Sequence, residues 1–155
     1  MLIEIPKVGS YKIENIVFDF NGTLASGGKV SPRVYRQILG LTKDFNIFIV
    51  TADTFNTVRE IFDDTEVRVK VISKENGSLD KKDFIAELNS SETIALGNGS
   101  NDAFMLKESI IGIGVLGSEG LSIGALENSD LMIRDINDFF EMMKAPKKLI
   151  ATLRK

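Results

Sequence analysis

The residues best suited to chemistry in this chain follow the short apolar run at residues 16–18. Asp19 ends that run, and Asn21, Gly22 and Thr23 come shortly after it as a turn-forming sequence. A strand that ends on a carboxylate before a tight turn holds that carboxylate where it can attack an electrophile or bind a cation. This pattern makes Asp19 the first candidate for a nucleophile.

Other polar groups follow apolar runs further along the chain. Thr51 and Asp53 follow one such run, and the glycine-rich segment 97–102 follows another. A lysine pair, Lys81 and Lys82, lies between them in the sequence. Hydroxyl, ammonium and carboxylate groups together are suited to stabilising a transferring phosphoryl group. The sequence therefore predicts a single site for phosphoryl chemistry.

The composition excludes several kinds of catalysis. The chain has no cysteine and no histidine, so disulfides, thiolate nucleophiles, cysteine-based zinc sites and a histidine general base are ruled out. Catalysis must then depend on carboxylates, hydroxyls, lysines or a hard cation.

The charge and hydropathy patterns bear on partners and location. The net charge of −3 argues against a nucleic-acid surface spread over the whole chain. No apolar run approaches the roughly eighteen residues that a membrane span needs, and the N-terminus lacks a signal-peptide pattern. We therefore expect a cytoplasmic protein that has no membrane or nucleic-acid partner.

Short apolar runs alternate with stretches of helical periodicity, which is the pattern of a parallel βα sheet. The runs are residues 16–18, 47–50, 67–72, 93–96, 110–115 and 131–133. We predict a doubly wound, Rossmann-like α/β fold that forms one domain over residues 1–155, with connections too short for a cap domain. Valines alternate with charged residues in 67–72, which is typical of a strand near a sheet edge.

Several helix boundaries can be predicted from capping residues. Ser31 followed by Pro32 is typical of a helix start, and Asp80 is expected to cap the next clear helix. Apolar residues at helical spacing in 136–143 predict another helix, and Pro146 is expected to open the last one.

The two ends of the chain have their own patterns. Residues 1–12, with a glycine–serine turn, are predicted to form a β-hairpin. Residues 144–155 contain five basic residues and no acid, and we expect a C-terminal helix with a solvated basic face.

The predicted sheet gathers the polar residues in one place. Ligands of parallel sheets bind outside the carboxyl ends of the strands, and Asp19, Thr51, Asp53 and segment 97–102 all follow strand ends. Gly97, Gly99 and the helix start at Asn101 add a flexible backbone that suits an anion or a crowded cation site.

Four segments carry a family resemblance. In chain order, DFNGTL, VTADTFNT, Lys81 and GNGSNDAFML resemble the four signature motifs of the haloacid dehalogenase (HAD) superfamily. The resemblance is closest to the phosphorylation domain of P-type ATPases, and it covers roughly residues 13–140. Without membrane segments or the large nucleotide-binding insertion, the chain resembles the small soluble relatives of those ATPases. The resemblance implies a HAD-like fold.

The resemblance also implies roles for individual residues. Asp19 would form an aspartyl phosphate with a phosphorylated small molecule, assisted by Thr51 and by Lys81, which is preferred to Lys82, with Lys74 as a third choice. The implied Mg²⁺ ligands are Asp19, the backbone carbonyl of Asn21, Asn98 and Asp102. The supporting residues are Gly22, Thr23, Asp53, Gly97, Gly99 and Asn101. Asp53 has an alternative role as a loop-orienting or helix-capping residue.

Two positions depart from the family pattern. Many phosphatases of the superfamily have an acidic residue at the position of Asn21, and asparagine can neither protonate a leaving group nor activate water. We therefore expect slow dephosphorylation. The family has a magnesium-binding aspartate at the position of Asn98, and the lost charge predicts Mg²⁺ affinity only in the millimolar range.

Other functions remain open on the sequence. The chain can be an ATP hydrolase, or a catalytically weak module that binds phosphate or assembles homo-oligomers through its basic tail and sheet edge. A phospho-acceptor receiver domain combines similar residues but would carry its acceptor near the middle of the chain, unlike Asp19. Gly112, Gly114 and Gly117 match a dinucleotide-binding pattern without its strand-to-helix turn, which argues against such a site.

Overall fold

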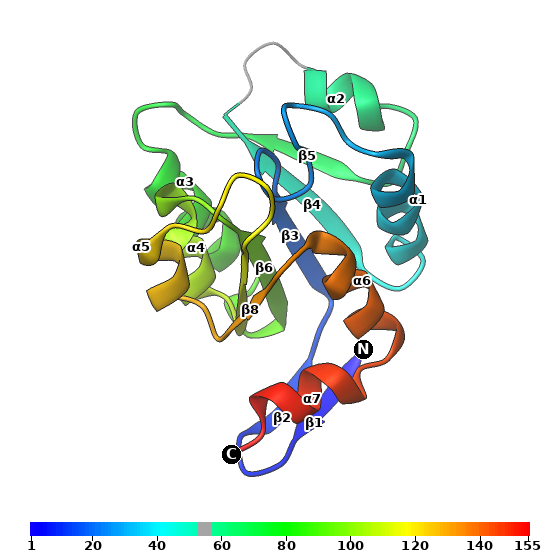
Figure 1. Cartoon of the computed structure of the whole chain (residues 1–155), viewed down its shortest axis with the longest axis vertical. Coiled ribbons are helices and arrows are strands. Elements are labelled where there is room, and N and C mark those ends of the chain that lie inside the picture. The colour runs from blue at the N-terminus through cyan, green and yellow to red at the C-terminus, as the bar shows by residue number, and fades with distance from the viewer. Residues whose placement is uncertain (53–56) are drawn as a thin grey trace.

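A six-stranded parallel sheet forms the centre of the computed structural model, which describes residues 1–52 and 57–155 (Figure 1). In chain order its strands are β3 (Asn15–Asp19), β4 (Asn46–Thr51), β5 (Arg68–Val71), β6 (Thr93–Gly97), β7 (Ile111–Val115) and β8 (Leu131–Ile133). Their order across the sheet is β5-β4-β3-β6-β7-β8. Strand β3, which ends at Asp19, is therefore central, and its neighbours are β4 and β6.

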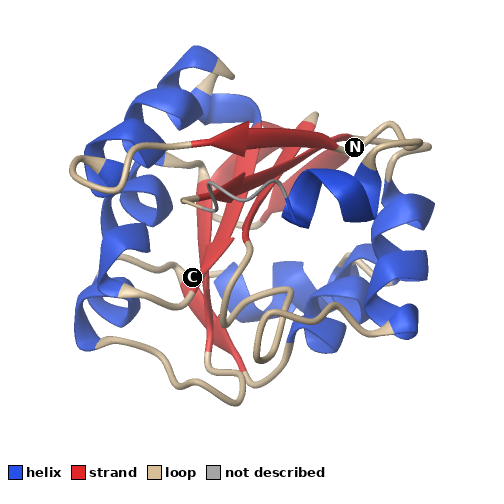
Figure 2. Ribbon diagram, turned by 90° about the horizontal axis from the view of Figure 1, so that it is seen from above, coloured by secondary structure: helices blue, strands red, loops and turns tan. Residues whose placement is uncertain are grey.

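Helices cover both faces of the sheet (Figure 2). One layer contains α1 (Pro32–Leu41), α2 (Thr57–Phe62) and α6 (Ile136–Lys144), and the other contains α3 (Gly77–Glu87), α4 (Ala103–Glu108) and α5 (Ile123–Glu127). Two short 3₁₀ turns, η1 (Ser90–Glu92) and η2 (Ser100–Asp102), flank β6. This arrangement confirms the predicted doubly wound α/β fold.

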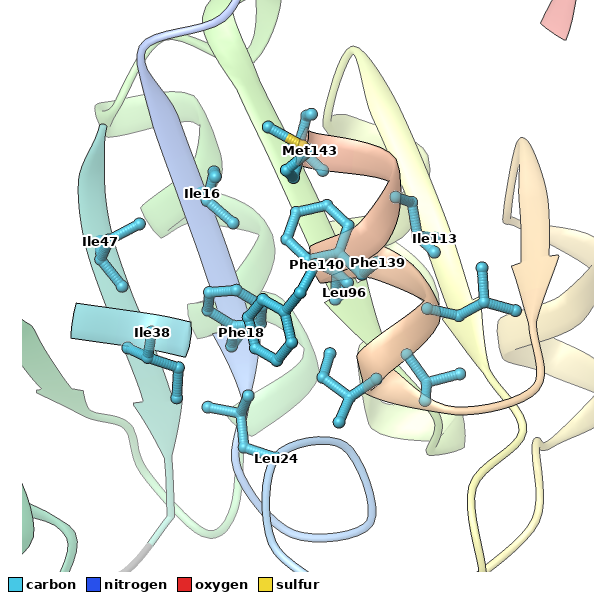
Figure 3. Close-up of a cluster of buried hydrophobic side chains, with 14 of the residues drawn as sticks. Ile16, Phe18, Leu24, Ile38, Ile47, Leu96, Ile113, Phe139, Phe140 and Met143 are labelled. Carbon is cyan, nitrogen blue, oxygen red and sulfur yellow. The ribbon is translucent and has the colours of Figure 1, made fainter. Parts of the chain in front are cut away.

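Strand β3 contributes to the hydrophobic core on both faces, because successive side chains of a strand point in opposite directions. Ile16 and Phe18 pack in the core under α1 and α6, whereas Val17 packs in the core under α3 and α4. Phe18 meets the ring of Phe139 edge-on at 5.6 Å between centroids and lies 6.4 Å from Phe140 (Figure 3). These contacts fix the strand that carries Asp19.

The N-terminal hairpin is present, as predicted. Its strands β1 (Leu2–Ile5) and β2 (Gly9–Lys12) pair antiparallel, and the last helix, α7 (Lys147–Leu153), packs beside β1 (Figure 1). Leu149 is buried while Lys147 and Lys148 are exposed, so the basic residues of α7 face away from the hairpin.

Strand and helix boundaries follow the sequence in most places. β5 lies at the edge of the sheet with Arg68 and Lys70 exposed, as its alternation predicted. Helix α1 begins at Pro32, and the Ser31 hydroxyl oxygen accepts a hydrogen bond from the backbone N–H of Val34 at 3.2 Å. Among the described residues, no helix has both the length and the apolar character of a membrane span.

The predicted capping role of Asp80 is wrong. Helix α3 begins at Gly77, and Asp80 lies inside its first turn. The Asp80 carboxylate accepts a hydrogen bond from the backbone N–H of Ser73 at 2.9 Å. Asp80 therefore joins the loop that follows β5 to the first turn of α3.

Candidate active site

The strand order marks the end of β3 as the expected place of a ligand-binding crevice. Counted from β3, the order is 3-2-1-4-5-6, and it reverses direction between β3 and β6. Such a reversal opens a ligand-binding crevice at the carboxyl ends of the two strands. Phe18 pairs with Leu96 in this register, so Asp19 and Gly97 leave the sheet side by side.

A buried cluster of three charged groups lies at this reversal. The ammonium group of Lys81 donates to Oδ1 of Asp19 at 2.6 Å and to Oδ1 of Asp102 at 2.5 Å. Asp19 is 8% exposed, Lys81 is 1% exposed and Asp102 is fully buried. Buried charges are rare unless they are paired or serve a ligand. One lysine thus joins the last residue of β3 to a residue after β6.

Helix α3 explains why Lys81 is inside the protein and Lys82 is outside. Phe84 and Ile85, three and four residues after Lys81, are both buried against the sheet. Residues at this spacing share one face of a helix, so Lys81 is on the face directed at the core. Lys82 and Lys74 are exposed.

Asp102 is fixed by the loop that precedes it. Its Oδ2 accepts the backbone N–H groups of Asn98 at 2.9 Å and Gly99 at 2.8 Å, while its Oδ1 accepts from Lys81. A Cβ atom at Gly97 would lie 2.5 Å from the Cβ of Asp102, so only glycine permits this approach. Asn101 lies exposed in η2.

The surroundings of Asp19 favour the protonated form of its carboxyl group. Burial raises the pKa of the Asp19 carboxyl to about 7; the charge of Asp102 adds to the rise and Lys81 opposes it. Burial lowers the pKa of Lys81, but the two carboxylates outweigh this effect and hold the pKa above its ordinary value. With both carboxylates ionised, these three groups carry a net charge of −1.

The loop after β3 turns back sharply on itself. Gly22 has a positive φ of 80°, and its N–H donates to the carbonyl of Ala25 at 2.9 Å. This confirms the turn at Asn21, Gly22 and Thr23. Asn21 is exposed and Thr23 is buried.

Thr51 and Asp53 were the predicted residues after β4. Thr51 is 2% exposed and ends the strand beside β3, where Asp19 pairs with the preceding Val50. Asp53 lies outside the described residues.

Asn98 connects two loops through its side chain. Its Oδ1 accepts from the hydroxyl of Thr23 at 3.3 Å, and its Nδ2 donates to the carbonyl of Gly120 at 3.1 Å. Sequence reasoning missed Gly120, which lies between β7 and α5. The contact is made by a backbone carbonyl, which has no sequence signature; the two glycines of this segment, Gly117 and Gly120, both adopt positive φ.

The glycine pattern that matched a dinucleotide motif has a packing role. Gly112 and Gly114 lie within β7. A Cβ atom at Gly112 would lie 2.4 Å from the backbone oxygen of Leu106, so glycine allows α4 to pack closely on the strand.

The donor atoms in the crevice fit a hard cation. Carboxylate, amide and carbonyl oxygens are the ligands that Mg²⁺ prefers, and the buried net charge of −1 favours a cation. In residues 1–52 and 57–155, no group of three or more acidic, histidine or cysteine side chains is arranged to hold a metal. A cation here would therefore have few protein ligands among these residues, and the candidates predicted from the sequence are Asp19, Asp102 and the oxygens of Asn21 and Asn98.

Sequence comparison matches part of the chain to one other protein. No protein-family model matches the chain. An uncharacterized protein of Methanocaldococcus jannaschii is 41% identical over 61 residues, which span 39% of this chain and 66% of that protein, just under two thirds of its length.

Solved structures of phosphatases have the same fold. The cobalt-bound deoxy-D-mannose-octulosonate 8-phosphate phosphatase of Haemophilus influenzae superposes with a TM-score of 0.70 at 14% identity, covering 85% of this chain and 87% of that chain. The corresponding phosphatase of Moraxella catarrhalis, in complex with magnesium, phosphate and KDO, gives 0.64 at 15% identity and covers 92% and 94%.

A third structure, a phospho-aspartyl intermediate analogue of phosphoserine phosphatase, superposes with a TM-score of 0.58 at 17% identity, covering 86% of this chain and 98% of that chain. All three are phosphatases with the HAD fold. At these identities the likeness establishes the fold, and the chemistry of this chain has to be argued from its own residues.

Proposed function

We propose that this chain is a phosphoric ester hydrolase of the HAD superfamily that uses Asp19 as its nucleophile. The observation that carries the proposal is the buried ion-paired cluster of Asp19, Lys81 and Asp102 at the strand-order reversal. Its position at the end of the central strand, in a fold shared with phosphatases, supports a reaction on a phosphorylated small molecule.

The reaction has two steps. A carboxylate oxygen of Asp19 bonds to phosphorus, and the ester oxygen leaves with the electron pair of the broken P–O bond. Water then attacks the aspartyl phosphate, which releases inorganic phosphate and restores the carboxylate. Lys81 and the hydroxyl of Thr51 stabilise the negative charge on the phosphoryl oxygens, while Asp102 holds Lys81 in place.

We assign Mg²⁺ binding to Asp19, the backbone carbonyl of Asn21, Asn98 and Asp102. When bound, the ion supplies positive charge that offsets the charge of the phosphoryl group. The asparagine at position 98 supports weak binding, in the millimolar range, because a neutral amide attracts a divalent ion less than a carboxylate does.

Asn21 makes the second step slow in this proposal. It is exposed in the turn after β3, but its amide can neither donate nor take up a proton at neutral pH, and general acid–base catalysis typically contributes about 10²- to 10⁴-fold. The phosphoenzyme therefore accumulates. Phosphoenzyme accumulation is also the behaviour expected of a soluble P-type-ATPase-like subgroup, to which we assign the chain.

The strand order counts against a receiver domain. Receiver domains have the flavodoxin-like order 2-1-3-4-5, whereas the order here is 3-2-1-4-5-6 counted from β3. The acceptor also lies on the first strand of this sheet, at Asp19.

Hydrolysis of para-nitrophenyl phosphate across a range of Mg²⁺ concentrations tests the proposal. We expect an initial burst followed by slow turnover, with both lost in Asp19→Asn and kept in Asp44→Asn, which makes the same change at an exposed site. Turnover that survives Asp19→Asn would contradict the assignment of the nucleophile. A wild type that shows neither burst nor turnover, with this ester or with phosphorylated metabolites, would favour a binding module instead. The same assay with ATP and other phosphorylated metabolites gives the substrate class.

A further inference from the structure

The side chain of Asn98 joins two loops at the rim of the crevice. The nucleophile loop is residues 20–29, which follow β3, and the β7 loop is residues 116–122, which follow β7. We propose that Asn98 is a positioning residue that ties the nucleophile loop to the β7 loop and thereby sets the geometry at Asp19. The part of this inference that concerns catalysis rests on the proposed function.

The hydrogen bonds of Asn98 reach both loops. Its Oδ1 accepts from Thr23 in the nucleophile loop at 3.3 Å, and its Nδ2 donates to the carbonyl of Gly120 in the β7 loop at 3.1 Å. Its backbone carbonyl also accepts the N–H of Ser122 at 2.8 Å. Both ends of the amide are thus bonded to protein atoms.

The two loops also touch directly. A Cβ atom at Gly22 would lie 2.4 Å from Nδ2 of Asn98, and one at Gly117 would lie 2.9 Å from the carbonyl oxygen of Gly22. Both glycines have positive φ, 80° and 54°. At the exposed side, the hydroxyls of Ser26 and Ser118 are 2.9 Å apart. The contact therefore extends along the nucleophile loop.

The β7 loop is a firm support for this contact. The backbone N–H of Leu116 donates to Ile133 and that of Gly117 donates to Arg134, both at 2.9 Å. These bonds continue the pairing of β7 with β8 beyond the strand end. The β7 loop is thus anchored to the sheet independently of Asn98.

The chemistry of the bonds explains why an amide is needed at this position. A carboxylate has no donor for the carbonyl of Gly120 and would place a negative charge against that oxygen. An aspartate at position 98 would gain charge for a cation but lose the connection to the β7 loop. Asn98 therefore contributes order to the nucleophile loop at the expense of cation affinity.

Amide hydrogen exchange, measured without metal or substrate, tests the tie directly. In Asn98→Asp we expect residues 20–29 to exchange roughly tenfold faster, since the hydrogen bond to the carbonyl of Gly120 is lost and a negative charge faces that oxygen. Thr23→Val removes the hydrogen bond from the Thr23 hydroxyl to Oδ1 of Asn98, and it should also speed the amide exchange of residues 20–29. The matched control is Asn128→Asp. It loses the hydrogen bond from the side-chain amide of Asn128 to the carbonyl of Gly124 in α5 and should leave the exchange rates of residues 20–29 unchanged.

The burst rate at saturating Mg²⁺ tests the catalytic part. A positioning role predicts a burst roughly tenfold slower in Asn98→Asp, which added Mg²⁺ does not restore. Unchanged exchange of residues 20–29 in Asn98→Asp would overturn the tie. An unchanged or faster burst, with tighter Mg²⁺ binding, would overturn the positioning role. If the wild type has no activity, the exchange result still decides the tie, and only the proposed function fails.

Discussion

The two ends of strand β3 each carry a buried polar side chain, and the surroundings of the two differ. At the start of the strand, Asn15 is 6% exposed; at the end, Asp19 is 8% exposed. Both ends lie beside β6 and both form hydrogen bonds to distant parts of the chain. Burial and bonding alone therefore do not separate a structural position from a reactive one.

The start of β3 is neutral and internally satisfied. The amide of Asn15 donates to the carbonyl of Leu88 at 2.8 Å and to the hydroxyl of Thr93 at 3.3 Å, and its oxygen accepts from Asn46 at 3.0 Å. Thr93 in turn donates to the carbonyl of Asn89 at 2.8 Å. This network joins the first residues of β3, β4 and β6 and carries no charge.

The end of β3 is charged and unbalanced. Asp19 and Asp102 share the single ammonium group of Lys81, which leaves one negative charge in a buried cluster when both carboxylates are ionised. Such an arrangement is costly for stability unless a cation or a reacting group uses it. The difference between the ends is thus residual charge, and we take that charge as the mark of the functional end.

The largest expected effect is on activity at the charged end. Asp19→Asn should lower the burst and the turnover by at least about 10³-fold, as expected when a nucleophile is removed. The steady-state assay with para-nitrophenyl phosphate measures this loss. Asn15→Ala at the neutral end should leave kcat unchanged. If Asn15→Ala lowers kcat as much as Asp19→Asn does, residual charge does not mark the functional end.

Removal of the shared cation should give the largest change in stability. Lys81→Met leaves two buried carboxylates without their shared cation, and we expect the free energy of unfolding to fall by about 3–5 kcal/mol. Lys82→Ala, at the exposed neighbour, should change it by no more than about 0.5 kcal/mol. Urea denaturation gives both values.

A double variant shows whether charge is the cause. In the double variant Lys81→Met with Asp102→Asn, the negative charge of Asp102 is removed as well. This variant should be more stable than Lys81→Met alone. Equal or lower stability of the double variant would mean that packing, and not charge, explains the effect of Lys81→Met.

The raised pKa of Asp19 predicts a pH dependence confined to the charged end. The folded-state pKa of about 7 lies above the ordinary value of 3.8, so the folded protein holds this proton more tightly than the unfolded chain does. The resulting stabilisation is complete below pH 3.8 and is lost as the pH rises through 7. In metal-free protein, the free energy of unfolding of Asp19→Asn should therefore increase relative to that of the wild type as the pH rises from 4 to 7. If the difference in the free energy of unfolding between Asp19→Asn and the wild type is constant from pH 4 to 7, the pKa of Asp19 is not raised.

The smallest effect is expected at the neutral end. Asn15→Ala leaves the carbonyl of Leu88 and the amide of Asn46 without their partner, and the free energy of unfolding should fall by about 1–3 kcal/mol. Its control, Asn46→Ala, removes an exposed donor and should cost less. A pH-dependent difference between Asn15→Ala and the wild type over pH 4 to 7 would show that the neutral end carries an unrecognised charge effect.

Most of the fold could be predicted from local patterns. Apolar runs located the strands of the sheet, and the alternation in 67–72 placed β5 at an edge. The position of Lys81 on the buried face of α3 follows from its spacing to Phe84 and Ile85. The helix start near Asp80 was misplaced because a carboxylate near a helix start can bond to a loop outside the helix, and here it bonds to Ser73.

Contacts between distant loops were beyond local patterns. The bond from Asn98 to the carbonyl of Gly120 depends on where two loops meet in space, and a backbone carbonyl has no sequence signature. The network of Asn15 and Thr93 has the same character, since it spans β3 and β6. The catalytic roles of Asp19, Thr51 and Lys81 stay predictions, because position and charge do not by themselves demonstrate a reaction.

The most direct test of the central claim is to trap the covalent intermediate. The protein is incubated with para-nitrophenyl phosphate and Mg²⁺, quenched in acid, digested and analysed by mass spectrometry. We expect one phosphoryl group on the peptide that contains Asp19, removable by hydroxylamine and absent in Asp19→Asn. A phosphoryl group on another residue, or one that persists in Asp19→Asn, would contradict the claim that the charged end of β3 is the reactive one.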